Sequence, residues 1–131
     1  MTNYSKQLQD KIIAYYESYY QSCGLKDFKE RSFARLAEER EEEKKMDYLQ
    51  KILGIDFLGQ KHFVFGAGTA GLAIVLAKKY GCSIFGIEPD DQEFEIIKQK
   101  LQEASLPAQN FKKEFGEKTS FLNSQFDFVH C

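Results

Sequence analysis

The chain has 131 residues, enough for one domain with one hydrophobic core. Hydrophobic residues make up 43% and charged residues 29%, a globular composition that excludes a long disordered chain. The formal net charge of −2 provides no overall positive field, so we expect neither nucleic acid nor a membrane surface as a partner. No apolar run approaches the roughly 20 residues of a membrane helix, and the polar N-terminal stretch carries no secretion signal.

The cysteines and histidines are too few and too scattered for a metal site. Cys23, Cys82 and Cys131 lie far apart, form no C-x-x-C pair, and have only His62 and His130 to join them. We therefore predict no metal ligand set. Three free thiols suit a reducing compartment, so we predict a cytoplasmic location.

Residues 4–22 carry apolar side chains at helical spacing, which predicts a helix. Four of its tyrosines form a cluster that permits two interpretations: Tyr15, Tyr16, Tyr19 and Tyr20. They stack on a ring of a ligand, or one face of the cluster packs on the domain while the rest stays at the surface. We favour packing, because a tyrosine ring buries a large apolar area wherever it lies.

Residues 27–53 form a second predicted helical region. Asp27 and Glu30 have the spacing of a capping box at its start. A charged run follows, in which pairs such as Glu41 and Lys45 lie at the favourable i, i+4 spacing. Such a run is typical of a solvated helix face.

The centre of the chain alternates between strand, glycine turn and helix. Residues 61–65 are apolar almost throughout, as expected of a central parallel strand, and lead into the glycine-rich turn 66–71. A helix is predicted over 72–80 and a second strand over 83–87, which ends at Glu88. This is the first half of a nucleotide-binding unit of the Rossmann kind.

Two more strands are expected after this unit. Pro89 ends the second strand, and Asp90 with Glu93 predicts a capping box for the next helix. A third strand is predicted over 110–115 and a fourth over 126–131. The expected fold class is therefore α/β, with a parallel sheet of about four strands behind an N-terminal helical segment.

The glycine turn provides the chemistry of a nucleotide site. Gly66 and Gly68 let a ligand approach bare backbone, and the helix start behind them directs N–H groups at it. Thr69 is placed to satisfy a free donor at that helix start. Glu88, 22 residues after Gly66, can accept two hydrogen bonds from a ribose diol. The pattern therefore indicates an adenosine-type ligand with a free 2′-hydroxyl.

Three stretches carry a resemblance to a known family: FVFGAGTAGLAIVLAKKYG, GIEPDDQEFEIIKQK and FDFVHC. In order and spacing they resemble the class I S-adenosylmethionine-dependent methyltransferases, in particular the small-molecule enzymes of the ubiquinone-biosynthesis type. The resemblance implies that residues 58–131 are the N-terminal half of a Rossmann-like cofactor-binding domain, with residues 1–57 as a helical cap or lid. It also implies a sheet of seven strands, of which we identify four.

The resemblance implies a site for S-adenosylmethionine and a small-molecule methyl acceptor. The turn would face the methionine end, Glu88 the ribose and Pro89 the adenine, and the loop after the third strand would also contact the adenine. The implied contacts are Gly66, Ala67, Gly68, Thr69, Glu88, Pro89, Gly116, Glu117 and His130. The catalytic residue stays unknown. By chemistry and position His130 is the candidate base, although a polar residue that closes a strand is the favoured interpretation.

Three positions depart from the family pattern. Val64 stands where an acid usually helps to hold the methionine end, Ala70 where a third glycine is usual, and Phe115 where an acid usually contacts the adenine. These departures affect cofactor affinity and activity. Other functions stay open: an NAD- or FAD-binding oxidoreductase module, or a non-catalytic interaction subunit with the same fold.

A sheet that stops at a fourth strand leaves an unpaired apolar edge. We therefore expect that the chain is a truncated domain, or that it pairs through this edge. The partner would be a second copy in a homodimer or a missing C-terminal half.

Overall fold

The structure is a computed structural model that describes residues 3–131. Four helical elements precede the sheet: α1 (Lys6–Ser22), α2 (Phe28–Ala34), the 3-10 turn η1 (Arg35–Ala37) and α3 (Glu38–Leu53). The sheet region contains β1 (Lys61–Phe65), α4 (Gly71–Lys78), β2 (Ser83–Ile87), α5 (Asp91–Glu103), η2 (Ala108–Asn110), β3 (Phe111–Lys112), η3 (Gly116–Lys118) and β4 (Phe128–His130).

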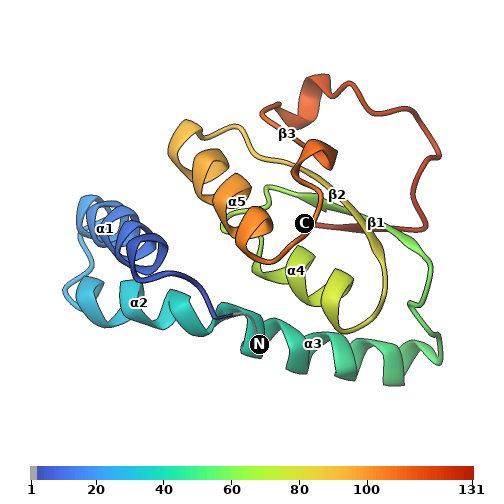
Figure 1. Cartoon of the computed structure of the whole chain (residues 1–131), viewed down its shortest axis with the longest axis horizontal. Coiled ribbons are helices and arrows are strands. Elements are labelled where there is room, and N and C mark those ends of the chain that lie inside the picture. Colours follow the sequence, from blue (N-terminus) through green and yellow to red (C-terminus); the bar gives the residue numbers. More distant parts are fainter. Residues whose placement is uncertain (1–2) are drawn as a thin grey trace.

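The four strands form one parallel sheet in the order β3-β2-β1-β4, with α4 and α5 as crossover connections. Phe63 of β1 lies opposite Phe85 of β2, and Val64 lies opposite His130 of β4. Figure 1 shows α4 and α5 between the sheet and the N-terminal helices. The predicted α/β fold with a four-stranded parallel sheet is confirmed. In each strand–helix–strand unit the helix brings the chain back across the sheet, so that the next strand runs parallel to the one before it.

The last two strands are shorter than predicted. Only residues 111–112 pair in β3, because the chain turns at Glu114, whose carboxylate accepts hydrogen bonds from Thr119 and from Ser120. In β4, residues 128–130 form the strand, and Asp127 before it accepts a 2.8 Å hydrogen bond from the backbone N–H of Lys61. A local side-chain hydrogen-bond network therefore follows β3, and a side-chain hydrogen bond to β1 lies at the start of β4.

The helical region over 27–53 is not continuous as predicted, since η1 interrupts it. The Asp27 side chain does not cap α2. Its two carboxylate oxygens each accept a hydrogen bond from Arg31 Nε at 2.8 Å. In α3 the predicted Glu41–Lys45 pair is also wrong, because Lys45 pairs with Glu42 at 2.8 Å instead.

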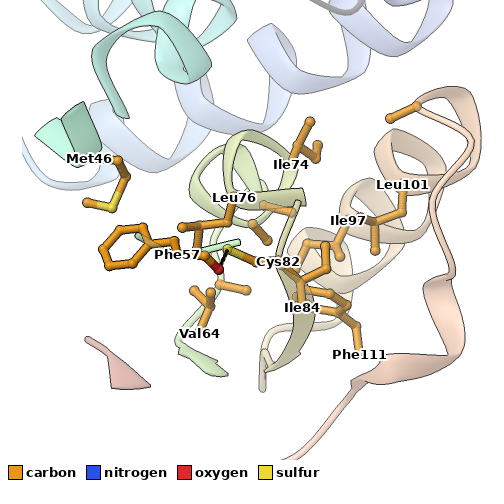
Figure 2. Packing of buried hydrophobic residues seen from close by; sticks show 14 residues of the cluster. Met46, Phe57, Val64, Ile74, Leu76, Cys82, Ile84, Ile97, Leu101 and Phe111 are labelled. Carbon is orange, nitrogen blue, oxygen red and sulfur yellow. Dashed lines mark hydrogen bonds between the residues drawn. The ribbon is translucent and has the colours of Figure 1, made fainter. Parts of the chain in front are cut away.

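One continuous core joins the helices to the sheet (Figure 2). Phe57, just before β1, is fully buried and belongs to the same core cluster as Leu76 of α4 and Leu101 of α5. Cys82 lies in the same core and donates to the backbone oxygen of Phe57 at 3.4 Å. Burial raises the pKa of this thiol to about 11, so Cys82 is a packing residue rather than a reactive thiolate.

The N-terminal segment, predicted as residues 1–57, packs on α5 through a second cluster; its first two residues lie outside the described part. Leu8, Ile12 and Tyr16 of α1 are buried against Ile96 of α5. Tyr19 by contrast is 50% exposed. The tyrosines thus pack on one face and reach the surface on another, as the favoured interpretation predicted.

The opposite face of the sheet carries an aromatic cluster. Phe63 and Phe85 contact Phe121 and Phe126 of the segment before β4, with ring centroids 4.9–6.1 Å apart. β4 is the last strand in the sheet order, and its Val129 is 58% exposed. Within residues 3–131, no helix is both long and apolar enough to cross a membrane.

Candidate functional site

The turn between β1 and α4 uses the left-handed backbone region three times. Gly66 has φ +64° and Gly68 has φ +55°, a backbone conformation that glycine adopts without strain. Ala70 has φ +61° and is fully buried. An alanine in this region is strained by roughly 1–2 kcal/mol. The replacement of the usual third glycine by Ala70 therefore costs conformational energy in the turn.

Glu88 joins the end of β2 to the glycine turn. Its Oε1 accepts a 3.3 Å hydrogen bond from the backbone N–H of Gly68, and the residue is only 6% exposed. The pKa of Glu88 is raised to about 8, first by burial and then by a hydrogen bond with Glu93 and the negative charge of Glu93, while the hydrogen bond from Gly68 opposes the shift. The predicted ribose acid therefore lies against the predicted methionine turn.

Thr69 does not have the predicted role. The residue is fully buried, and its hydroxyl donates to the carboxylate of Glu38 at the start of α3. The N-cap of α4 is Ala70, which has no side-chain oxygen. Thr69 therefore ties the turn to the N-terminal segment and does not cap the helix behind it.

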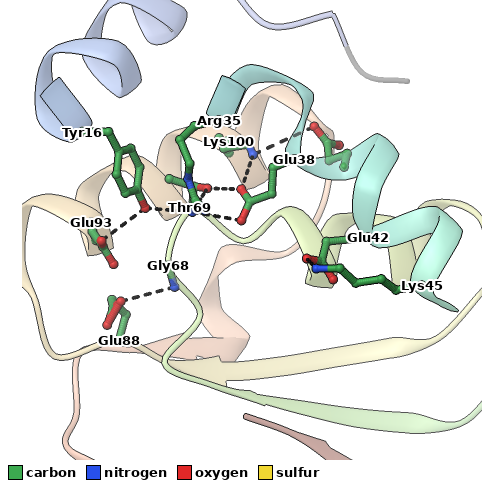
Figure 3. A network of polar contacts seen from close by, with 11 residues as sticks. Tyr16, Arg35, Glu38, Glu42, Lys45, Gly68, Thr69, Glu88, Glu93 and Lys100 are labelled. Carbon is green, nitrogen blue, oxygen red and sulfur yellow. Dashed lines mark hydrogen bonds and ion pairs between the residues drawn. The ribbon is translucent and has the colours of Figure 1, made fainter. Parts of the chain in front are cut away.

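Arg35 is the centre of a polar network above the turn (Figure 3). Its Nη2 lies 3.0 Å from the Tyr16 hydroxyl, 3.0 Å from Glu38 Oε1 and 3.4 Å from Thr69 Oγ1. The Tyr16 hydroxyl in turn donates to Glu93 at 3.2 Å. One guanidinium thus connects α1, α3 and the glycine turn. Its Nε is buried and has no hydrogen-bond partner among the described residues.

Lys100 of α5 lies beside this network (Figure 3). The residue is 2% exposed, and its ammonium lies 4.0 Å from Glu38 and 3.9 Å from Glu39. Burial lowers the pKa of Lys100, while the two carboxylates act in the opposite direction. Lys100 therefore offsets part of the negative charge that α3 brings to the site.

A cavity of about 560 Å³ opens beside the turn. Gly66, Ala67 and Gly68 form one wall, and His130 at the end of β4 forms another. A larger cleft of about 660 Å³ lies elsewhere, between α3, α4 and the end of α5. The smaller cavity is the candidate ligand site, because it lies at the carboxyl ends of parallel strands where β1 separates connections to opposite sides.

The charged wall of this cavity comes from residues that the sequence did not predict as site residues. Val64, where the family has an acid, is 5% exposed and apolar. The carboxylates are supplied by α3 instead, by Glu38 and Glu42, whose side chains are 15% and 18% exposed. A signal was available, because Glu38 and Glu42 lie two turns and one turn before the buried Met46 on one helix face.

The other predicted site residues lie further from the cavity. Pro89 is half-buried directly after Glu88, and Glu117 is exposed. Gly116 packs on the Phe65 ring so closely that a Cβ there would lie 2.0 Å from Phe65 Cε2. A side chain at residue 116 would therefore require the Phe65 ring, which is 43% exposed, to move. Within residues 3–131, no group of three or more His, Cys, Asp or Glu side chains could hold a metal ion.

Comparison with known families decides the fold family. The family described as "Methyltransferase domain" matches residues 64–131, which is 68 of 131 residues. The chain belongs to this family. The motif resemblance is thereby confirmed. No curated protein matches the chain.

Solved structures agree on the fold. A protein of Methanococcus maripaludis, assigned as an S-adenosyl-L-methionine-dependent methyltransferase, is 17% identical with a TM-score of 0.58 over 98% of this chain and 52% of its own. A protein of Galdieria sulphuraria, assigned as a sarcosine dimethylglycine methyltransferase, is 21% identical with a TM-score of 0.55 over 66% of this chain and 32% of its own.

A mutant of MtNAS, solved in complex with S-adenosylmethionine, is 14% identical with a TM-score of 0.56 over 94% of this chain and 44% of its own. This methyltransferase-family chain therefore spans about a third to a half of the length of the structures it matches.

Proposed function

We propose that this methyltransferase domain binds S-adenosylmethionine and takes part in methyl transfer to a small-molecule acceptor. The observation that carries the proposal is the contact between Glu88 and the backbone N–H of Gly68. Glu88, which on this proposal binds the ribose diol, lies at one end of the glycine turn, while the 560 Å³ cavity lies along the turn's other side. A nucleoside with a polar substituent at its 5′ position has this shape.

The charges in the cavity fit the amino-acid end of the cofactor, which carries a carboxylate and an ammonium group. Arg35 uses only Nη2 in its three hydrogen bonds, so donors of its guanidinium remain for a carboxylate. Glu42 pairs with the Lys45 ammonium at 2.8 Å and would pair with the ammonium group of the ligand instead when the ligand binds. On this proposal Glu42 of α3 takes the role of the family's usual acid, whose position in this chain is occupied by Val64.

Glu88 would accept hydrogen bonds from both ribose hydroxyls, in place of the Gly68 N–H that it now contacts. Pro89 and the loop at Gly116 and Glu117 would border the adenine. When bound, S-adenosylmethionine supplies a methyl group made labile by a positive sulfur. The chain's contribution is alignment and exclusion of water, for which the α1–α3 segment is held over the turn by Tyr16 and Arg35.

A small acceptor is supported by the site's form. The cavity lies within the roughly 300–1,000 Å³ range of small-molecule sites, and the net charge of −2 provides no field for a polyanion. The proposal includes a partner strand on the β4 edge, from a second copy or from the rest of a methyltransferase domain. It also includes a cytoplasmic location, for which the free thiols of Cys23, Cys82 and Cys131 are the support.

Calorimetric titration with S-adenosylhomocysteine, S-adenosylmethionine and NAD tests the cofactor. We expect the two adenosyl ligands to bind and Glu88→Ala to weaken them at least about tenfold, since a hydrogen bond to a charged group contributes roughly 1.5–3 kcal/mol. Glu95→Gln on α5 is the matched control, because its side chain is 65% exposed and pairs only with Lys98 among the ion pairs. Binding of NAD with no response to the other two ligands would overturn the proposal.

The amino-acid clamp has its own test. Glu42→Gln should weaken S-adenosylhomocysteine about tenfold while it leaves 5′-methylthioadenosine unchanged, because the latter lacks the ammonium and carboxylate groups. Glu41→Gln removes the same charge from a side chain that is 61% exposed and serves as control. Equal weakening of both ligands by Glu42→Gln would contradict this placement.

A further inference from the structure

A pair of histidines connects the core of the sheet to the candidate cavity. The β1–β4 register places His62 opposite Phe128 and Val64 opposite His130. His62 Nδ1 lies 2.9 Å from His130 Nε2, and His62 Nε2 lies 3.1 Å from Gln60 Oε1. His62 is fully buried, whereas His130 lines the cavity beside Gly66 and Gly68. The pair therefore runs from a buried anchor to the candidate site.

The hydrogen bonds determine which nitrogen of each ring carries the proton. With the Gln60 carbonyl oxygen facing His62, only an N–H at His62 Nε2 can make this bond. A neutral His62 then presents an unprotonated Nδ1, so the 2.9 Å bond requires an N–H at His130 Nε2. The remaining nitrogen, His130 Nδ1, carries a free lone pair.

Both rings are neutral near pH 7. The pKa of His62 is lowered to about 4, first by burial and then by His130, while Asp127 opposes the shift. Burial also lowers the pKa of His130, which Glu42 on α3 partly opposes. The other ionisable groups at this end of the cavity are Lys45 and Cys131.

The remaining acids of the cavity are already engaged. Glu38 accepts from Thr69 and Arg35, and Glu42 pairs with Lys45. The lone pair at His130 Nδ1 is the basic position that the hydrogen bonds leave available. We propose that His130 is the proton acceptor for the methyl acceptor, and that His62 is a positioning residue that holds His130 in the basic tautomer.

This inference rests on the proposed function and narrows its substrate class. The acceptor would be a hydroxyl, thiol or amine that must lose a proton, rather than a tertiary amine or a thioether, which has none. Its heteroatom lone pair forms the bond to the methyl carbon, and the carbon–sulfur bond breaks with its electron pair left on sulfur. The acceptor's proton passes to His130 Nδ1, and the resulting imidazolium later releases it to water.

His62 contributes at that moment as well. The imidazolium of His130 keeps its Nε2–H bond to His62 Nδ1, and a hydrogen bond from a charged donor is stronger than a neutral one. General-base assistance of this kind typically accelerates a reaction by about 10²–10⁴-fold. Removal of the acceptor nitrogen at residue 62 should therefore reduce the basicity of His130 without touching the cavity.

Nitrogen-15 NMR of histidine-labelled protein tests the tautomers, and the two histidines of the chain give two simple sets of signals. We expect both rings to carry the proton on Nε2, with His62 not titrating above pH 5. His62→Phe fits between Phe57 and Phe128 and should keep the fold while it frees His130 from its tautomer. His62→Asn, which keeps an acceptor near the position of Nδ1, should return the nitrogen-15 signals of His130 to those of the Nε2–H tautomer.

Diethyl pyrocarbonate mapped by mass spectrometry reports the lone pair directly. His130 should react and His62 should not, and S-adenosylhomocysteine should slow the reaction at His130. An Nδ1–H tautomer or an unreactive His130, in protein that binds S-adenosylhomocysteine, overturns the inference and leaves the proposed function intact. Predicted tautomers in protein that binds neither adenosyl ligand overturn the proposed function, and this inference with it.

Discussion

The raised pKa of Glu88 makes cofactor binding depend on pH in a defined direction. In the ligand-free domain this carboxyl has a pKa of about 8, because it is buried beside Glu93. A carboxylate that accepts two ribose hydroxyls must be ionised. At pH 7 only about one molecule in eleven is in that form, so the apparent affinity is about tenfold below its value at high pH.

Isothermal titration with S-adenosylhomocysteine between pH 6 and pH 9 measures this effect. We expect the dissociation constant to fall about tenfold from pH 6 to pH 7 and to level off above pH 8. At pH 7, titrations in buffers of different ionisation enthalpy should show release of about 0.9 proton per ligand bound. Glu88→Gln should bind more weakly, with no proton release and no pH dependence in this range.

The same shift has a consequence for stability. The unfolded pKa of about 4.5 is lower than the folded value, so the folded domain binds this proton more tightly. The stabilisation is fully present below pH 4.5 and is lost as the pH rises through 8. Relative to Glu88→Gln, the natural chain should therefore lose stability over that range. An affinity that stays flat from pH 6 to pH 9, together with no proton release, would refute the reasoning.

Three further predictions concern the scaffold, each measured by chemical denaturation. Lys100→Met should destabilise the fold by about 3–5 kcal/mol, because it removes the buried ammonium that offsets the negative charges of Glu38 and Glu39. A smaller loss for Lys100→Met combined with Glu39→Gln is the control. Asp90→Ala removes the 2.8 Å cap to the Glu93 N–H and should cost about 1 kcal/mol, a loss that Asp90→Asn should largely avoid. Phe57→Ala should cost about 3–5 kcal/mol, since this ring is fully buried, and a cost below 1 kcal/mol would contradict the core assignment.

The central unit could be predicted well because its signals are local. The strands over 61–65 and 83–87 have the predicted bounds, since a short apolar run between turn residues fits a buried parallel strand and little else. Gly66 and Gly68 have the left-handed backbone that glycine tolerates. The distance in sequence from this turn to Glu88 likewise follows from one helix and one strand between them.

The errors arose where a side chain found a charged partner in place of the expected backbone group. Thr69 was expected to cap the helix behind it, but its hydroxyl donates a hydrogen bond to Glu38 of α3. Asp27 was expected to cap α2, but Arg31 occupies its carboxylate. In both cases a local hydrogen bond and a charged partner compete for the same group, and a charge-assisted bond is the stronger of the two.

By itself, the sequence determined the α/β fold, the position of the glycine turn and the acid at the end of the second strand. Helix and strand periods and glycine's backbone freedom are properties of residues close together in the chain. Only the tertiary structure placed α3 over the turn, with Glu42 and Arg35 at the cavity and His62 bonded to His130. These groups are 24 to 68 residues from their counterparts at the site. Their meeting depends on how whole elements pack, which no local pattern records.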